Sequence, residues 1–396
     1  MTQHSTFDVT GPTADGGPGK PGAFPRQAIY MDYNGSAPMS AEVVAAMAPL
    51  LASGQGNPSS GHWAAAQAVD ALREARARVA ALIGASPGEI VFTSGGTEAN
   101  NMAIKGIVPL RRIAGAHFIS GAVEHDAVLQ PLRFLKSLGA RITLVPVDRF
   151  GIVAPDTVAK AIRPETRLIS IMHANNEIGT IPPIREIAAI GRAHGVPVHT
   201  DAAQSAGKVA IDVRALGVDM LSLAAHKIGG PKAIGALFIR KGLRLTPHLH
   251  GGGHEDGRRA GTENAMLAAG FGAAARAATG KDQDRVRGLR DRLWSGLKDH
   301  FGPRIVLNGH PEHRTPNTLS MSFPGYVGTE ILRKLPHLAA TTGSACHAGC
   351  VTMSRVLVAM GCPLSVGMGT VRLSLGPANT SEDIECVIAD FIRVLG

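Results

Sequence analysis

Residues 89–106 read EIVFTSGGTEANNMAIKG, and this stretch sets the architecture predicted for the whole chain. Residues 90–93 form a short apolar run of the length of a buried strand, and the end of the stretch has helical character. Two glycines join these parts, and Thr97 and Glu98 stand in the first turn of the predicted helix. Because the amides at a helix start lack partners, this turn predicts a phosphate cradle. A glycine-rich turn with a threonine cap explains the same residues at least as well.

The alternation of short apolar runs with helical segments continues along the chain. Amphipathic helices are predicted, for example, at residues 64–83 and 184–194. This alternation predicts an α/β fold with a mostly parallel sheet covered on both faces. Ligands of such sheets bind beyond the carboxyl ends of the strands, so the residues just after each strand are the first candidates for a ligand-binding site. Further strands are predicted at residues 117–120, 142–147, 168–172, 198–200, 220–223 and 236–239.

Composition divides the chain into three regions. Residues 1–25 are predicted to be a flexible leader, because nine of the fifteen positions from 11 to 25 are Gly or Pro. Residues 37–275 carry the alternating pattern and form the predicted large, ligand-binding domain. The pattern then changes to a charged helix and shorter segments, which predicts a smaller α+β domain made of residues 26–36 and 276–396.

Composition and charge exclude several classes of function. The 40 basic residues outnumber 31 acidic ones, but they are dispersed and accompanied by only 3 Tyr and 2 Trp, so no nucleic-acid partner is expected. The positive net charge instead favours an acidic protein partner. The longest nearly apolar run, residues 265–275, is too short for a membrane span. Four cysteines make no disulfide framework and no secretory leader is apparent, so a reducing, cytoplasmic location is expected.

Polar residues with distinctive chemistry follow four more of the predicted strands. Each has a simple structural explanation when taken alone, as a helix cap, a turn former or a solvated loop residue. Together with the cradle, they offer an acid for a pyridine nitrogen, a lysine for a Schiff base and a histidine for stacking on a ring. These are the requirements of pyridoxal 5′-phosphate (PLP). The residues are His125, Asn175, Asn176, Asp201, His226 and Lys227.

Two of the four cysteines stand close together in a loop of small residues, TGSACHAGCV at 342–351. A thiolate is a good nucleophile, and His347 beside Cys346 favours that reactive form. Taken alone, Cys346 is better explained as a small buried apolar residue. Cys350 either relays or resolves a product formed on Cys346, or it only fills a small-residue position. Cys362 and Cys386 lie in apolar segments and are predicted to be structural.

Ten motifs, in this order and spacing, resemble the cysteine desulfurases, with a close likeness to the related selenocysteine lyases. The resemblance runs from about residue 30 to the C-terminus. It implies a fold type I PLP enzyme of the class V aminotransferase group, which is a homodimer with active sites near the subunit interface. The motifs are YMDYNGSAP, GNPSSGHW, EIVFTSGGTEANNMAIKG, AVEHDAV, SIMHANNEIGTI, HTDAAQSAGK, AAHKIGGPK, GGGHEDGRRAGTEN, TTGSACHAG and VRLSLG.

The resemblance implies a role for each matching residue. Lys227 matches the lysine that forms the Schiff base with PLP, Asp201 the partner of the pyridine nitrogen, and His125 the histidine stacked on the ring. Cys346 matches the catalytic cysteine. Other implied contacts are those to PLP from Gly96, Thr97, Asn176, Gln204, His226 and, from the other subunit, Thr262, and those to the substrate from Asn34, Asn176 and Arg372.

The implied reaction removes sulfur from L-cysteine. PLP makes the Cβ substituent labile, the Cys346 thiolate takes the sulfur, and L-alanine is left with a persulfide that passes to a sulfur-acceptor protein. Three alternatives remain: a selenocysteine lyase that acts on L-selenocysteine, a non-catalytic PLP-fold scaffold of sulfur transfer, and an ordinary class V aminotransferase. The aminotransferase gives no reason for the thiol in GSAC.

Several positions depart from the family pattern. Ala224 replaces a serine that contacts the phosphate, a change shared with the selenocysteine lyases. His254 stands in place of a glutamine, Asp256 in place of an arginine, and GSA at 35–37 in place of ATT. His248, His250, His254 and Glu255 also resemble a metal cluster, but the family match explains this stretch as an interface loop near the phosphate, and no metal is expected.

Overall fold

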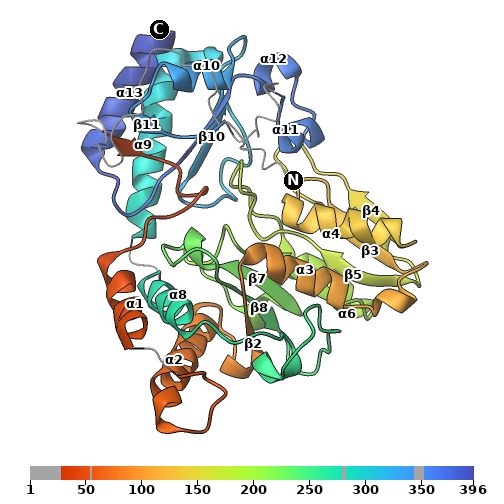
Figure 1. Cartoon of the computed structure of the whole chain (residues 1–396). Coiled ribbons are helices and arrows are strands. Elements are labelled where there is room, and N and C mark those ends of the chain that lie inside the picture. Colours follow the sequence, from red (N-terminus) through yellow and green to blue (C-terminus); the bar gives the residue numbers. More distant parts are fainter. Residues whose placement is uncertain (1–27, 54–55, 279–281, 343–351) are drawn as a thin grey trace, which may run out of the picture.

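A seven-stranded sheet forms the centre of the larger lobe of the protein (Figure 1). The structure is a computed structural model, which describes residues 28–53, 56–278, 282–342 and 352–396. All neighbouring strands of the sheet are parallel except β8, which runs antiparallel to β2 and β7. The predicted α/β fold with a mostly parallel sheet is therefore confirmed. The strand order is β2 (Ile90–Thr93), β8 (Gly235–Ile239), β7 (Met220–Ala224), β6 (Val198–Asp201), β5 (Thr166–Ser170), β3 (His117–Gly121) and β4 (Arg141–Val145).

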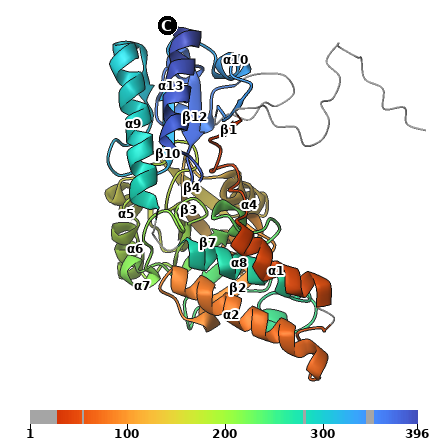
Figure 2. The ribbon, with the colours of Figure 1, turned by 90° about the vertical axis from the view of Figure 1, so that its left-hand side faces the viewer.

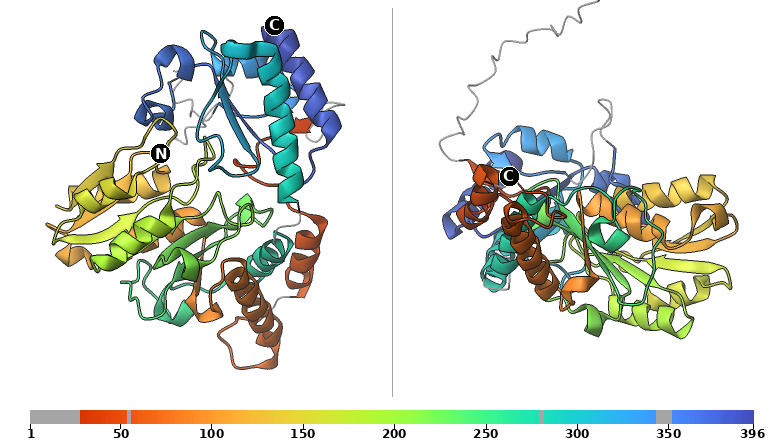
Figure 3. Two further views of the ribbon diagram at one scale, coloured as in Figure 1. Left: turned by 180° about the vertical axis from the view of Figure 1, so that it is seen from behind. Right: turned by 60° about the horizontal axis from the view of Figure 1, so that its bottom comes forward.

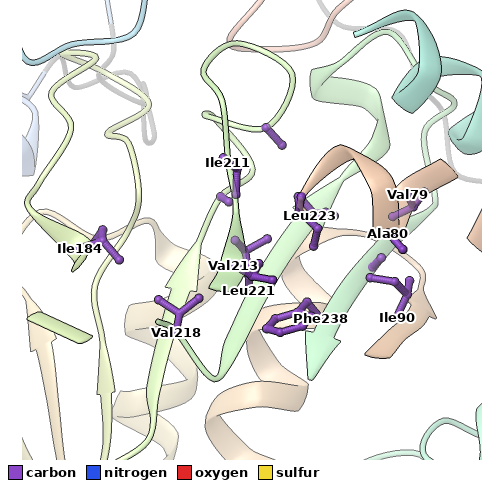
Figure 4. Packing of buried hydrophobic residues seen from close by; sticks show 14 of the residues in the cluster. Val79, Ala80, Ile90, Ile184, Ile211, Val213, Val218, Leu221, Leu223 and Phe238 are labelled. Carbon is purple, nitrogen blue, oxygen red and sulfur yellow. The ribbon is translucent and has the colours of Figure 1, made fainter. Parts of the chain in front are cut away.

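Successive side chains of a central strand enter different apolar clusters on the two faces of the sheet. Leu221 and Leu223 of β7 pack with Phe238 in one cluster (Figure 4), while Met220 belongs to a second cluster. The first cluster contains α2 (Ala66–Leu82), α6 (Ile184–Ala193) and α8 (Ala265–Ala277), and the second contains α3 (Gly96–Gly106) and α4 (Asp126–Ser137). Because burial of each large apolar side chain contributes about 2 kcal/mol, this double layer fixes the strand ends in space.

The observed strand boundaries differ from prediction at β5 and β4. The apolar run predicted a strand over 168–172, but β5 ends at Ser170 and Met172 donates its amide to the Glu124 carboxylate at 2.9 Å. Ile171 and Met172 are buried as an extension of the strand, so an apolar pattern alone does not locate the end of the ladder. The predicted strand at 142–147 is β4, which ends at Val145.

The smaller lobe combines both ends of the described chain. Its apolar core joins Ile29 and Met31 with residues between 286 and 395. A three-stranded antiparallel sheet has the order β12 (Thr370–Ser374), β10 (Thr318–Ser322) and β9 (Val306–Leu307), and β1 (Ile29–Tyr30) pairs in parallel with β11 (Leu338–Ala339). The helices α9 (Gln283–Phe301) and α13 (Ser381–Leu395) lie side by side (Figures 2 and 3). The predicted domain boundaries near residues 36 and 275 stay predictions.

The remaining helices are short or peripheral. No helix in the described ranges is long and apolar enough to cross a membrane. The other α-helices are α1 (Ala41–Ser53), α5 (Pro155–Ala161), α7 (Val213–Leu216), α10 (Gly328–Arg333), α11 (Arg355–Ala359) and α12 (Leu364–Gly367).

Candidate active site

A cavity of about 350 Å³ lies where the ends of several strands of the large sheet meet the small lobe. Most of the residues predicted from the sequence line it. Thr262 lies instead at a second cavity of about 220 Å³, and Cys346 falls outside the described residues. The predicted residues that line the first cavity are Asn34, Gly96, Thr97, His125, Asn176, Asp201, Gln204, His226, Lys227 and Arg372.

Glycines shape the end of the cavity where α3 begins. Gly95 caps the helix with φ of 150°, which only glycine adopts readily, and a Cβ on Gly235 of β8 would lie 2.6 Å from the Gly95 backbone. A Cβ on Gly96 would lie 3.3 Å from that of Ala224. The first turn of this 11-residue helix therefore presents its amides and the exposed Thr97 to the cavity. The geometry suits an anionic group such as a phosphate.

His226 is next to this cradle. Its Nδ1 lies 3.3 Å from the Ser36 hydroxyl. Burial, and then the charges of Lys227 and Lys232, lower the pKa of His226 to about 4. The imidazole is therefore neutral at neutral pH and binds an anion by hydrogen bonding rather than by charge.

Asp201 is held in a fixed orientation at the end of β6. It is nearly buried, its Oδ1 accepts the Ala203 amide at 2.9 Å, and its Oδ2 accepts Asn100 Nδ2 at 2.6 Å. Sequence reasoning missed Asn100, although Asn100 follows Gly96 by one helical turn and so shares the face of α3 that points to the cavity. A buried carboxylate with aligned donors suits a protonated ring nitrogen.

Lys227 lines the cavity. Its Nζ donates to the carbonyl oxygens of Asn34 at 2.6 Å and Gly35 at 2.9 Å. Burial lowers the pKa of Lys227 to about 8, and the Arg372 charge acts in the same direction, while Asp32 and Asp201 oppose it. A substantial fraction of this amine is therefore neutral near physiological pH, which is the form that attacks an aldehyde.

Arg372 enters the cavity from β12 of the small lobe. Its Nη1 donates to the Asn176 carbonyl oxygen and its Nη2 to Asp32 Oδ1, both at 2.8 Å. Its Nε is buried and has no hydrogen-bond partner among the described residues. The backbone of Arg372 also pairs with that of Thr341, close to the end of the described range at residue 342. The ion pair with Asp32 had no signal in the sequence.

His125 is an exposed residue that caps α4. Its Nδ1 accepts the Ala127 amide at 3.1 Å, so in the neutral ring the proton is on Nε2. The neighbouring Glu124 is buried, and burial, reinforced by the charge of Asp201, raises its pKa well above the usual range. The predicted Asn175 has a structural role, because its Oδ1 accepts the amides of Glu177 and Ile178.

Two of the four residues considered as a metal cluster, Glu255 and His254, form hydrogen bonds within the protein. Glu255 accepts the guanidinium of Arg76 at 2.6 Å and the Phe92 amide at 3.1 Å. His254 Nδ1 accepts the Gly261 amide, and Asp256 pairs with Arg258. The mixed donor group found within the described ranges is His337, Cys386 and Asp390, in the small lobe. Its carboxylate already pairs with His337 at 2.6 Å and with Arg393 at 2.5 Å.

Comparison with known proteins agrees with this geometry. Residues 29–387 match the family model described as Aminotransferase class-V. The chain is 43% identical over 375 residues to "Cysteine desulfurase IscS" of Dictyoglomus turgidum, which covers 93% of this chain and 95% of that protein. The chain belongs to the cysteine desulfurase family. Another member, "Cysteine desulfurase IscS" of Methanosarcina thermophila, is 45% identical over 367 residues, covering 91% of this chain and 90% of that protein.

Solved structures of the family have the same fold. A "NIFS-LIKE PROTEIN" matches with a TM-score of 0.86 and 33% identity, covering 93% of this chain and 99% of that one. A structure described as "SspA in complex with cysteine" matches with a TM-score of 0.80 and 36% identity, covering 89% of this chain and 99% of that one.

Cysteine desulfurases depend on PLP, and the cavity fits this group. The glycine-built cradle at Gly96 suits the phosphate, and Asp201 suits the ring nitrogen. Lys227 suits the aldehyde, because its pKa of about 8 leaves part of the amine unprotonated. The donor and acceptor set of the cavity therefore matches the cofactor at both ends and at the reactive carbon.

Proposed function

We propose that this protein is a PLP-dependent cysteine desulfurase that converts L-cysteine to L-alanine and collects the sulfur on Cys346. The observation that carries the proposal is that Lys227, Asp201 and Arg372 line one cavity. The first two suit the cofactor, and the third brings a guanidinium suited to a substrate carboxylate. The solved structure of a family member described as a complex with cysteine supports the choice of substrate.

The large lobe holds the cofactor in this proposal. Lys227 supplies the amine that binds it covalently, Asp201 the anion for the ring nitrogen, and the start of α3 the amides for the phosphate. PLP, when bound, withdraws electrons from the attached amino acid and makes its Cβ–S bond labile. Asn100 keeps the Asp201 carboxylate aligned through the 2.6 Å hydrogen bond.

Residues of both lobes bind the substrate in this proposal. Arg372 exchanges part of its pairing with Asp32 and Asn176 for the substrate carboxylate, which a planar guanidinium binds through two parallel hydrogen bonds. His125 carries its proton on Nε2, the atom that is available for proton transfer at the substrate. Asn34 and Asn176 supply further hydrogen-bonding groups to the cavity.

The Cys346 thiolate takes the sulfur. A new S–S bond forms between Cys346 and the substrate sulfur as the Cβ–S bond breaks. The electron pair of the broken bond goes to the alanine carbon, which then takes up a proton. The products are L-alanine and one enzyme persulfide, so atoms and electrons balance without an added oxidant.

Further properties belong to the same proposal. The persulfide passes to an acceptor protein, and the chain acts as a homodimer in which Thr262 of one subunit reaches the phosphate site of the other. Thr262 is exposed in the single chain, which suits that role. Cys362 and Cys386 are free thiols, as expected in a reducing compartment such as the cytoplasm.

The proposal is tested by replacing the thiol. Cys346→Ala is expected to keep cofactor binding and to lose at least about a hundredfold in sulfide release from L-cysteine, because no nucleophile receives the sulfur. Cys362→Ala, which removes a free thiol predicted to be structural, is the control and is expected to stay near wild type. Mass spectrometry of cysteine-treated enzyme should find the persulfide on Cys346. Undiminished sulfide release from Cys346→Ala would overturn the assignment.

L-selenocysteine is the alternative substrate. The family resemblance and Ala224 beside the cradle favour it, since selenocysteine lyases also lack the serine at that position. The curated relatives named as cysteine desulfurases favour L-cysteine. Turnover of both amino acids by one preparation decides between them, and negligible activity with L-cysteine would favour the lyase.

A further inference from the structure

Lys208 is a buried lysine that lies behind the cavity wall. It follows β6 after a tight turn in which Gly207 adopts φ of +70°. The turn brings the Lys208 amine within hydrogen-bond distance of the Gln204 side chain. Only 8% of its surface is exposed. Its Nζ donates to Gln204 Oε1 at 2.9 Å and to Asn34 Oδ1 at 2.8 Å.

The surroundings of Lys208 are unusual for a buried amine. No carboxylate within the described part of the chain lies at ion-pair distance from it, whereas buried lysines are normally paired. Burial lowers the pKa of Lys208 well below its ordinary value, and the charges of Lys227 and Arg372 act in the same direction. Its hydrogen-bond partners are the side-chain amide oxygens of Gln204 and Asn34, and both of these residues line the cavity.

The Lys208 amine fixes which way the Gln204 amide points. Its Nζ donates to the Gln204 oxygen, and the Asn34 carbonyl oxygen on the other side of the amide can only accept, so the oxygen of the Gln204 amide lies on the Lys208 side. The Nε2 group then faces the other way, where it donates to the Asn34 carbonyl oxygen at 2.9 Å and borders the cavity. The reversed amide would place two donors against each other on one side and two acceptors on the other.

We propose that Lys208 is a positioning residue that presents the Nε2 donor of Gln204 to the ring oxygen of the bound cofactor. The inference rests on the proposed function only for the identity of the cofactor. Lys208 itself does not line the cavity, so it acts through Gln204. A donor aimed at the ring oxygen stabilises its anionic form, and this lowers the pH at which the covalently bound cofactor loses its proton.

A purely structural role for Lys208 is the competing explanation. Asn34 joins the two lobes, because its side chain also contacts Thr318 Oγ1 at 2.8 Å and Asn317 Nδ2 at 3.0 Å. If Lys208 only tied Asn34 in place, its loss would change stability without moving the titration of the cofactor. The test therefore measures the pH titration of the bound cofactor.

The experiment follows the absorbance of the holoenzyme against pH in the absence of substrate. Lys208→Met is expected to raise the midpoint of this titration, the pH at which half of the bound cofactor has lost its proton, by about one pH unit. A shift of this size corresponds to the free energy of one hydrogen bond to a charged group. Lys208→Arg keeps a donor at this position, so its midpoint is expected to stay close to that of the wild type. The other titratable or charged groups around Lys227, namely Arg372, Asp32, Asp201 and His226, remain unchanged in all variants. Lys241→Met, which removes an exposed lysine, is the matched control and is expected to leave the midpoint unmoved.

A double substitution separates positioning from a direct effect of charge. In a Gln204→Leu background, Lys208→Met is expected to produce no further shift, since no amide remains to be oriented. If Lys208→Met does not fold, Lys208→Gln supplies a polar replacement for the same comparison. An unmoved midpoint in folded Lys208→Met, or an equal shift in the Gln204→Leu background, would overturn the proposal. Failure of the desulfurase reaction would leave these midpoints readable, because no substrate is used.

Discussion

The two halves of the cavity are built in different ways. The large-lobe half, with Gly96, Asp201 and Lys227, comes from the ends of β2, β6 and β7 in one sheet. The small-lobe half depends on contacts between distant parts of the chain, such as the hydrogen bond from Arg372 to the carbonyl oxygen of Asn176 in the large lobe, 196 positions earlier. The first half is therefore fixed by the packing of a single core, while the second depends on how the lobes meet. Cofactor binding and substrate binding should respond differently to substitution.

Arg372→Leu tests this separation with the largest expected effect. Loss of the bidentate contact to the substrate carboxylate should lower kcat/KM for L-cysteine about a hundredfold, mainly through KM. The affinity for PLP should change little, since Arg372 belongs to the substrate half. Arg372→Lys keeps the charge but loses the planar guanidinium, so its kcat/KM should lie between those of the wild type and Arg372→Leu. Arg393→Leu, which removes an exposed arginine of α13, is the control. Equal losses of PLP and substrate affinity would break the comparison.

The pH dependence of cofactor capture tests the large-lobe half. Attack on the aldehyde needs the neutral amine, and the pKa of Lys227 is about 8. About half of the amine is neutral at pH 8 and about 1% at pH 6, so the rate should rise roughly fiftyfold over this interval. Stopped-flow mixing of apoprotein with PLP measures the rate, with Nα-acetyl-lysine as the reference amine. A midpoint near that of an ordinary lysine would contradict this account of the site.

Ala224→Ser gives the smallest expected effect and sharpens the view of the phosphate end. The added hydroxyl lies beside Gly96 and should tighten PLP binding by about fivefold through one hydrogen bond. Kinetic parameters for L-cysteine at saturating PLP should not change. Ala224→Val adds bulk without a donor and is the control for steric crowding. The space is narrow here, since a Cβ added to Gly96 would lie 3.3 Å from the Ala224 Cβ. Weaker binding in the serine variant would show that the cradle has no room for a side chain there.

The same contrast explains how much the sequence predicts. The apolar runs locate the strands to within a few residues, and several strand ends carry a polar residue that lines the cavity, as with Asp201 and Lys227. Local patterns are sufficient there because a parallel sheet brings its carboxyl strand ends to one edge. The antiparallel direction of β8 was not predicted, although residues 225–234 alone connect it to β7, a connection short for a parallel crossover.

Contacts between remote residues account for what the sequence did not reveal. Asn100 lies inside a helix, and its hydrogen bond to Asp201 spans 101 positions. Lys208 ends the HTDAAQSAGK motif, but its bond to Asn34 spans 174 positions and appears only in the folded chain. Arg372 and Asn34 were assigned through the family resemblance, whereas their partners appear only in the folded chain. Cys346 also rests on the resemblance, and it lies outside the described residues.

The central claim is that the Lys227 amine is the covalent anchor of the cofactor in the large-lobe half of the cavity. Borohydride reduction of the PLP-loaded protein, followed by peptide mapping with mass spectrometry, tests it most directly. The account predicts a pyridoxyl group on Lys227 and its loss in Lys227→Ala. A pyridoxyl group on another lysine such as Lys208, or none on cofactor-saturated protein, would contradict it.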